Sequence, residues 1–280
     1  MSEFLRPVRG KSETGLLMGL STWSVFFVWM VFGSAIAIYA TSRMTGLNGE
    51  YLSVTIRFAL LWLLAWFAPR VFGRSSRTLL SATGDFRWRW LAIGSGAWLA
   101  ITLAMVAVEQ LLSPTTFTYT FELGRLPLMV AILFVVLPLQ TSAEELLFRS
   151  LVPQSLAAAI RSRLVVALLS GLLFALPHLS NPEVGEDFGW ALLAYGALGA
   201  AWTAAVIRTG GIEVSIGAHL ANNAFALLVV GYGNSALSSV SIWVVPASSM
   251  AIDAAKSLVG VALWLLVIHR LSGISKPRQD

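Results

Sequence analysis

The chain has 280 residues, of which 57% are hydrophobic and 12% charged, and its mean hydropathy is +0.77. Soluble domains carry about 25% charged residues, so this composition excludes an ordinary soluble protein and indicates a polytopic membrane protein. The chain has no cysteine, which excludes disulfides and thiolate chemistry. In such a protein, the sequence pI near 10 reflects basic cytoplasmic loops and does not indicate nucleic-acid binding.

Apolar segments long enough to cross a bilayer run through the whole chain, since about 20 such residues suffice for one helical span. We expect an all-α fold in a single transmembrane domain over residues 1–280. It comprises N-terminal helices in 16–112, a motif-bearing core at about 127–231 and a C-terminal helix at 249–269. About eight spans are predicted, at 16–40, 51–68, 89–112, 127–149 or beyond, 163–180, 189–207, 212–231 and 249–269. In the last, Asp253 and Lys256 are three residues apart, and we expect them to pair.

The distribution of basic residues predicts the orientation in the membrane. When the N-terminus is placed in the cytoplasm, most of the 19 lysines and arginines lie on or near the cytoplasmic side. The acidic loop 181–187 then lies outside. We therefore expect both termini in the cytoplasm and a multi-pass protein of the bacterial inner (cytoplasmic) membrane.

The most informative stretch is Glu144-Glu145-Leu146-Leu147-Phe148-Arg149, which places three ionisable groups inside an apolar region. Ionisable residues within a membrane are costly, and they are usually buried, paired and functional. On a helix, Glu145 and Arg149 share a face and can form an ion pair. Glu144 points about 100° away from Glu145 and needs a different partner.

Two further polar pairs lie inside predicted spans. Phe174 and His178 are four residues apart, and so are His219 and Asn223, so each pair lies on one helical face. A lone histidine in an apolar helix is more often a packed core residue than a catalyst. Here two of the three histidines are intramembrane and a third helix carries two glutamates, which favours a site.

The three motifs reach a common depth only under one condition. His178 lies about 22 Å from Arg163 along its helix, at 1.5 Å per residue. Glu144 reaches a similar depth only if its helix continues past Arg149 towards residue 160. Such a helix from 127 to 160 would be about 50 Å long, so we expect a break or kink at Pro138 or Pro153.

These groups suit hydrolysis in two alternative arrangements. In one, Glu144 and His178 hold and deprotonate a water, while His219 and Asn223 donate hydrogen bonds to an oxyanion. In the other, Glu144, His178 and His219 bind a catalytic zinc. The shared face of His219 and Asn223 favours the first arrangement, without a cofactor. It predicts that Glu144 approaches His178 and that His219 with Asn223 forms a separate wall of the same cavity.

The ordered motifs Glu-Glu-x-x-x-Arg, Phe-x-x-x-His and His-x-x-x-Asn resemble those of the CPBP intramembrane endopeptidases. This family includes the CAAX prenyl proteases and bacteriocin-immunity relatives, and its members are often called metalloproteases. The resemblance implies that Glu144 and His178 activate water and that His219 and Asn223 form the oxyanion hole. It gives Glu145, Arg149 and Phe174 supporting roles. Ser150 departs from the pattern, because many relatives have glycine there.

The resemblance implies an intramembrane protease acting on a peptide or a lipidated protein, with a CAAX-type prenylated protein as one option, within the lipid bilayer. A non-proteolytic immunity or scaffold protein of the same fold is an alternative. A secondary transporter with Glu144 and the histidines as a proton relay is another. The lack of a repeated pair of broken helices in the two halves argues against a transporter.

Overall fold

The computed structural model describes residues 3–8, 12–112, 114, 116–233 and 235–274, and these are almost entirely helical. The α-helices are α1 (Ser12–Val28), α2 (Ser34–Thr41), α3 (Gly46–Phe67), α4 (Trp88–Leu112), α5 (Leu126–Ala131), α6 (Leu137–Glu145), α7 (Val152–Ala159), α8 (Arg163–Ala175), α9 (Phe188–Thr209), α10 (Glu213–Ala224) and α11 (Met250–Ile274). The 3-10 turns are η1 (Glu3–Val8), η3 (Ala68–Phe72), η4 (Ser76–Leu79), η5 (Leu123–Arg125) and η8 (Leu176–Ser180). The π turns are η2 (Trp29–Gly33), η6 (Ile132–Val136), η7 (Leu146–Leu151) and η9 (Phe225–Val229).

The all-α membrane fold is confirmed. Among the described residues, seven helices are long and apolar enough to cross a membrane. The eighth span expected, at 212–231, is occupied by α10 and η9, which together run from Glu213 to Val229 and fall short of that length. This helix lies within the bundle, with its first seven residues buried.

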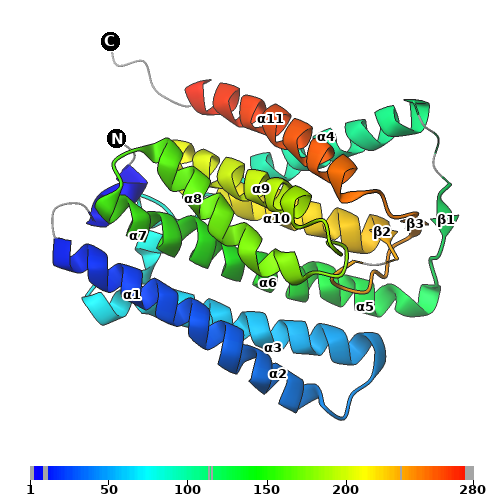
Figure 1. Ribbon diagram of the computed structural model, residues 1–280, viewed down its shortest axis with the longest axis horizontal. Helices are drawn as coiled ribbons and strands as arrows, with labels where there is room; N and C mark the ends of the chain where they lie inside the picture. The colour runs from blue at the N-terminus through cyan, green and yellow to red at the C-terminus, as the bar shows by residue number, and fades with distance from the viewer. Residues whose placement is uncertain (1–2, 9–11, 113, 115, 234, 275–280) are drawn as a thin grey trace.

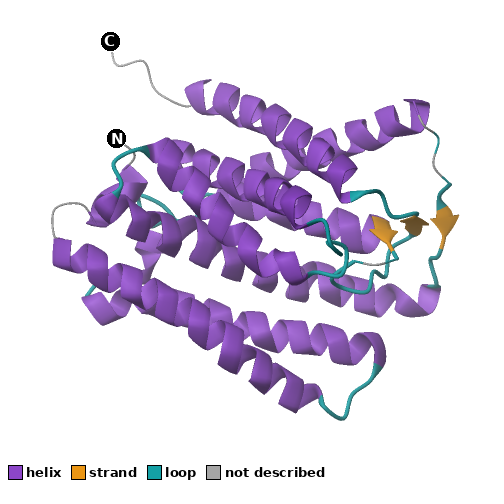
Figure 2. Ribbon diagram, in the orientation of Figure 1, coloured by secondary structure: helices purple, strands orange, loops and turns teal. Residues whose placement is uncertain are grey.

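The helices form a bundle whose central members carry the motifs. In Figure 1, α1, α2 and α3 lie on one side of the central helices, and α4 and α11 lie on the opposite side. The start of α1 and the end of α11 lie at the same end of the bundle. Three short strands, β1 (Thr118–Tyr119), β2 (Val230–Tyr232) and β3 (Trp243–Val245), close the other end in the order β1-β3-β2. Figure 2 shows this small sheet at the end of the bundle, next to the ends of the helices.

The helix that carries both glutamates is continuous but locally widened. It runs from Leu123 to Ala159 as one apolar span, so the predicted continuation beyond Arg149 is confirmed. The π turn η6 ends two residues before Pro138, and η7 ends two residues before Pro153. A proline cannot donate to the carbonyl four residues earlier, and a π turn accommodates that loss without breaking the helix.

Close backbone contact between α4 and α10 positions the second histidine. A Cβ atom added at Gly94 would lie 2.0 Å from the carbonyl oxygen of Val214, and one added at Gly217 would lie 2.2 Å from that of Leu91. Only glycine at both positions allows this approach. The start of α10 is also fixed, because Glu213 is fully buried and accepts from the Arg87 guanidinium at 2.7 and 2.8 Å.

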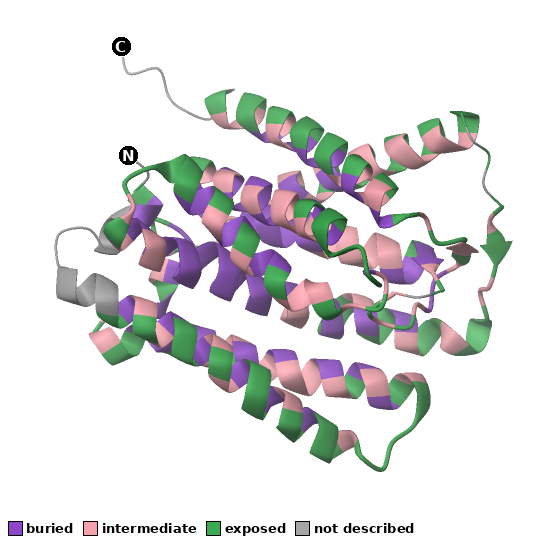
Figure 3. Cartoon of the chain, in the orientation of Figure 1, coloured by how far each residue is buried: buried purple, intermediate pink, exposed green. Residues whose placement is uncertain are grey.

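Most of the motif residues lie in the buried part of the bundle. In Figure 3 the buried residues concentrate in the centre of the bundle, and the outer helices expose apolar side chains, as a lipid-facing surface requires.

The expected ion pair between Asp253 and Lys256 does not form, so that prediction is wrong. Lys256 does not pair with Asp253 on its own helix but donates to Glu109 of α4 at 2.7 Å, while Asp253 accepts from Ser248. A tertiary neighbour therefore replaced the local partner.

Candidate active site

Glu145 and Arg149 form the ion pair that their helical spacing predicted. Arg149 Nε lies 3.3 Å from Glu145 Oε2, and both side chains are completely buried. The geometry is that of an ion pair without a hydrogen bond, because none of the three Arg149 nitrogens has a hydrogen-bond partner among the described residues. The guanidinium instead packs on aromatic rings, 4.1 Å from the centroid of Phe174 and 5.3 Å from that of Trp202. These cation–π contacts compensate part of its lost hydration.

His219 joins the two glutamates. Its Nδ1 donates to Glu145 Oε1 at 2.9 Å, and its Nε2 lies 3.5 Å from Glu144 Oε2. All three side chains are buried, Glu144 being 5% and His219 3% exposed. Glu145 thus fixes the ring of His219 and directs Nε2 at Glu144.

This placement changes one expectation. Among the residues that the structure describes, no direct ion pair within 4.0 Å joins Glu144 to His178, and their contact through a shared water stays a prediction. His219 lies directly against Glu144 and does not form a wall apart from it. The physical reason is that two adjacent buried carboxylates attract the imidazole more strongly than one would, and α10 packs directly against α6.

Phe174 holds the centre of the site. Its ring centroid lies 4.5 Å from that of His178 and 6.0 Å from that of His219. Its backbone carbonyl oxygen accepts from His178 Nδ1 at 2.7 Å. A carbonyl oxygen only accepts hydrogen bonds, so Nδ1 carries the proton and Nε2 keeps a free lone pair.

Asn223 lies one helical turn beyond His219 on α10, and it is half-buried. Its Oδ1 accepts from Asn222 Nδ2 at 3.1 Å, and Asn222 Oδ1 accepts in turn from Trp98 Nε1 at 3.3 Å. The Asn223 oxygen is therefore engaged, which leaves its Nδ2 as the donor available to another group.

The side chains present do not fit the zinc alternative. Within the described part of the chain, no three His, Asp or Glu side chains are arranged so that they could hold a metal ion. His219 directs one nitrogen to each glutamate, and His178 Nδ1 is bound to a carbonyl. The description of the chain as a metalloprotease therefore has no support from this donor set, and cofactor-free chemistry stays a prediction.

Two aromatic residues of α9 complete the site, and sequence reasoning missed both. The ring centroid of Trp202 lies 4.9 Å from that of His219, and Tyr195 stacks on His178 with centroids 4.6 Å apart and planes at 29°. A signal existed, because residues seven apart lie on one face of a helix. The helix 189–207 carries no acid or histidine, which is why it drew no attention.

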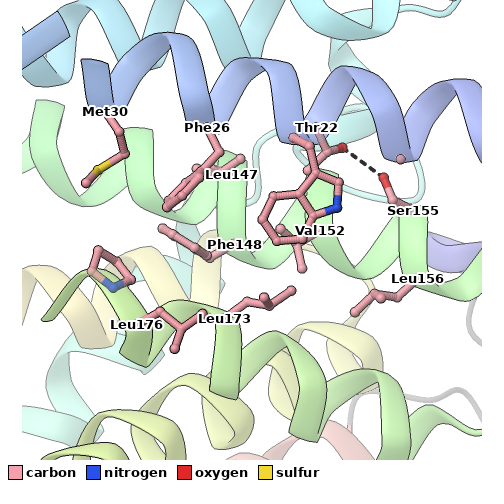
Figure 4. A pocket seen from close by; sticks show the side chains of 13 residues that line it. Thr22, Phe26, Met30, Leu147, Phe148, Val152, Ser155, Leu156, Leu173 and Leu176 are labelled. Atoms are coloured by element: carbon pink, nitrogen blue, oxygen red, sulfur yellow. Dashed lines mark hydrogen bonds between the residues drawn. The ribbon is translucent and has the colours of Figure 1, made fainter. Parts of the chain in front are cut away.

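An apolar cavity of about 220 Å³ lies beside the motif helix, between α1, α7 and α8 (Figure 4). Leu147 and Phe148 of the motif line one side, and Leu176 and Pro177, directly before His178, line another. Thr22 and Ser155 form a hydrogen bond of 2.8 Å in its wall. Three of the lining residues, Trp23, Met30 and Leu176, are exposed on the outer surface, so the cavity borders the lipid-facing side.

Comparison with known proteins supports the motif assignment. The family model of the Rce1-like type II CAAX prenyl endopeptidases matches residues 123–225, which include every proposed catalytic residue. The protein YyaK of Bacillus subtilis (strain 168) is 28% identical over 298 aligned residues, covering 94% of this chain and 96% of YyaK. No solved structure gives a significant match. The resemblance predicted from the three motifs is confirmed, since residues 123–225 are similar to the Rce1-like type II CAAX prenyl endopeptidases.

Proposed function

We propose that this protein is an intramembrane endopeptidase that hydrolyses a peptide bond of a membrane-associated substrate, with CAAX-type prenylated proteins as one substrate class. The observation that carries the proposal is the buried cluster of Glu144, Glu145 and His219. Such a cluster is costly to keep within a membrane and is typical of a functional site.

Glu144 is the proposed general base. Its Oε2 is buried and has no hydrogen-bond partner among the described residues, so it has free capacity to accept a proton from water. His178 offers Nε2 as a second acceptor, since its Nδ1 is bound to the Phe174 carbonyl. In the proposed mechanism both groups contact one water, which then attacks the substrate carbonyl.

His219 and Asn223 are the proposed oxyanion hole. Because His219 Nδ1 donates to Glu145, its Nε2 donates only when the ring is protonated. A protonated His219 with Arg149 would balance the two glutamates, giving a cluster without net charge. Asn223 adds its free Nδ2 as the second donor. Donors directed at a developing negative charge are worth more in a site that excludes water.

The apolar cavity of Figure 4 supports a substrate anchored in the membrane. It borders the lipid-facing surface and is lined by Pro177, the neighbour of the proposed catalytic His178. An aliphatic side chain or lipid chain of the substrate would therefore bury apolar surface there, at about 25 cal/mol per Å².

The test is cleavage of membrane-anchored peptides by the purified protein in liposomes. We expect the wild type to cleave, and Glu144→Gln, which keeps the shape of the side chain, to lose at least 100-fold in kcat with an unchanged melting temperature. Glu186→Gln, at an exposed acid of the outer loop, serves as the matched control. Wild-type-like cleavage by Glu144→Gln would remove Glu144 from the mechanism, and no cleavage by any form would favour a scaffold of the same fold.

The role of metal is tested separately. We expect full activity after dialysis against a chelator, because the site does not gather three metal ligands among the described residues. One tightly held zinc per chain, with activity lost on chelation and restored on return of the metal, would overturn the cofactor-free mechanism.

A further inference from the structure

His178 depends on support from outside its own helix. It lies in the 3-10 turn η8, directly after Pro177, where α8 has ended. Hydrogen bonds in 3-10 turns have poorer geometry than those in α-helices, and proline removes one donor. The one hydrogen bond of the His178 ring among the described residues is Nδ1 to the Phe174 carbonyl. That bond fixes one edge of the ring but allows the ring to tilt about it.

Tyr195 of α9 supplies the missing constraint. Its ring is nearly parallel to that of His178, at 29°, with the centroids 4.6 Å apart. Phe174 contacts the same imidazole at 4.5 Å. Aromatic pairs at these separations contribute about 0.5–1.5 kcal/mol beyond their burial, and they restrict the orientation of both rings.

The loop that follows η8 anchors Tyr195 in turn. The tyrosine hydroxyl donates to Glu183 Oε1 at 2.7 Å and accepts from Asn181 Nδ2 at 3.3 Å. Asn181 Nδ2 also donates to Glu183 Oε1 at 3.0 Å, which closes a triangle of hydrogen bonds. Asn181 follows His178 by only three residues. The loop after His178 therefore binds the hydroxyl of Tyr195, and the ring of Tyr195 stacks back on His178.

We propose that Tyr195, anchored by Asn181 and Glu183, is a positioning residue that holds the His178 ring with Nε2 directed at the attacking water. We name Tyr195, Asn181 and Glu183 together the aromatic latch. This role rests on the proposed function, because it concerns the water-activating histidine. The alternative is that the latch merely fastens the outer loop 181–187 to α9.

Two substitutions separate stacking from anchoring. Tyr195→Leu removes the aromatic face while keeping an apolar side chain, and we expect kcat to fall at least 10-fold with KM changed less than twofold. Tyr195→Phe keeps the stack and loses the hydroxyl, and we expect a loss of about threefold. Glu186→Gln, in the same loop but exposed, should behave as wild type. A merely structural latch would lower the melting temperature of Tyr195→Leu and leave kcat per folded molecule unchanged, which would overturn the proposal.

A chemical probe makes the test independent of activity. The rate of carbethoxylation by diethyl pyrocarbonate, followed at each histidine by mass spectrometry, reports access to the unprotonated ring. We expect Tyr195→Leu to raise the rate at His178 at least fivefold and to leave His219 and His269 unchanged. An unchanged rate at His178 would overturn the latch even if the enzyme is active. A raised rate in a protein that cleaves no peptide would support the latch and count against the proposed protease function.

Discussion

His219 does more than supply one hydrogen-bond donor to the site, because it contacts both glutamates. Glu145 determines where its ring points, and Arg149 offsets the charge of Glu145. The four groups therefore form one electrostatic unit within the membrane. Removing Glu145 or Arg149 leaves the charge of the other buried and uncompensated, so these two residues should affect stability, whereas Glu144, whose Oε2 has no hydrogen-bond partner among the described residues, should affect activity.

Arg149 is expected to act on stability. Arg149→Ala removes one partner of a fully buried pair and the cation that packs on Phe174, at a cost of about 3–5 kcal/mol. The melting temperature in detergent should fall clearly, whereas Arg163→Ala, at an exposed position, should leave it within a degree or two. If Arg149→Ala lost activity at an unchanged melting temperature, Arg149 would have to be placed among the groups that contact the substrate.

At the scale of elements, the site exists because one long helix is widened and two others approach closely. The π turn η7 spans residues 146–151, so it lies between Glu145 and Pro153. π turns are frequent at functional sites, because they rotate the following residues relative to the preceding ones. Close packing of α4 on α10 brings His219, two residues after Gly217, to the glutamates of α6.

Gly217 is therefore expected to be necessary for activity. In Gly217→Ala, the new Cβ atom would lie 2.2 Å from the Leu91 carbonyl oxygen, so α10 must move away from α4 and carry His219 with it. We expect at least a 10-fold loss of peptide cleavage together with a lower melting temperature. Gly96→Ala on α4, where nothing lies within 4 Å, is the matched control and should be neutral or slightly stabilising. Equal behaviour of the two variants would show that the close approach is not needed.

At the scale of the whole molecule, the expected orientation concerns which end of the bundle faces the cytoplasm. The beginning of α1 and the end of α11 lie at the same end (Figure 1), because the shorter α10 with η9 also runs along the bundle beside the seven membrane-length helices. The loops on the basic side hold Arg74 and Arg87, and the loop at the other end holds Glu183 and Glu186. Positively charged loops remain on the cytoplasmic side.

Cysteine labelling can test this orientation, since the natural chain has no cysteine. Single variants Ala82→Cys and Glu186→Cys place a thiol at exposed positions of the two opposite loops. In intact cells, a membrane-impermeant maleimide should label Glu186→Cys and reach Ala82→Cys only after lysis. Labelling of Ala82→Cys in intact cells would reverse the orientation.

The sequence by itself determined the class of fold and one local pair within a helix. Apolar spans of fixed length specify membrane helices, because unsatisfied backbone groups cannot remain in lipid. The spacing of Glu145 and Arg149 predicted their pair, since residues four apart share a helical face. The continuation of the glutamate helix beyond Arg149 followed from matching depths, although the widening at η6 and η7 did not.

Only the tertiary structure decided which groups meet across helices. Nothing in the sequence separates His178 from His219 as the neighbour of Glu144, because depth along a helix is readable but rotation about the bundle axis is not. Lys256 likewise pairs with Glu109 of another helix and not with Asp253 of its own helix. The stack of Tyr195 on His178 depends on how α9 packs against α8 and η8. Helical periodicity gives the face of each residue, whereas the packing of small side chains at the helix contacts determines which faces meet.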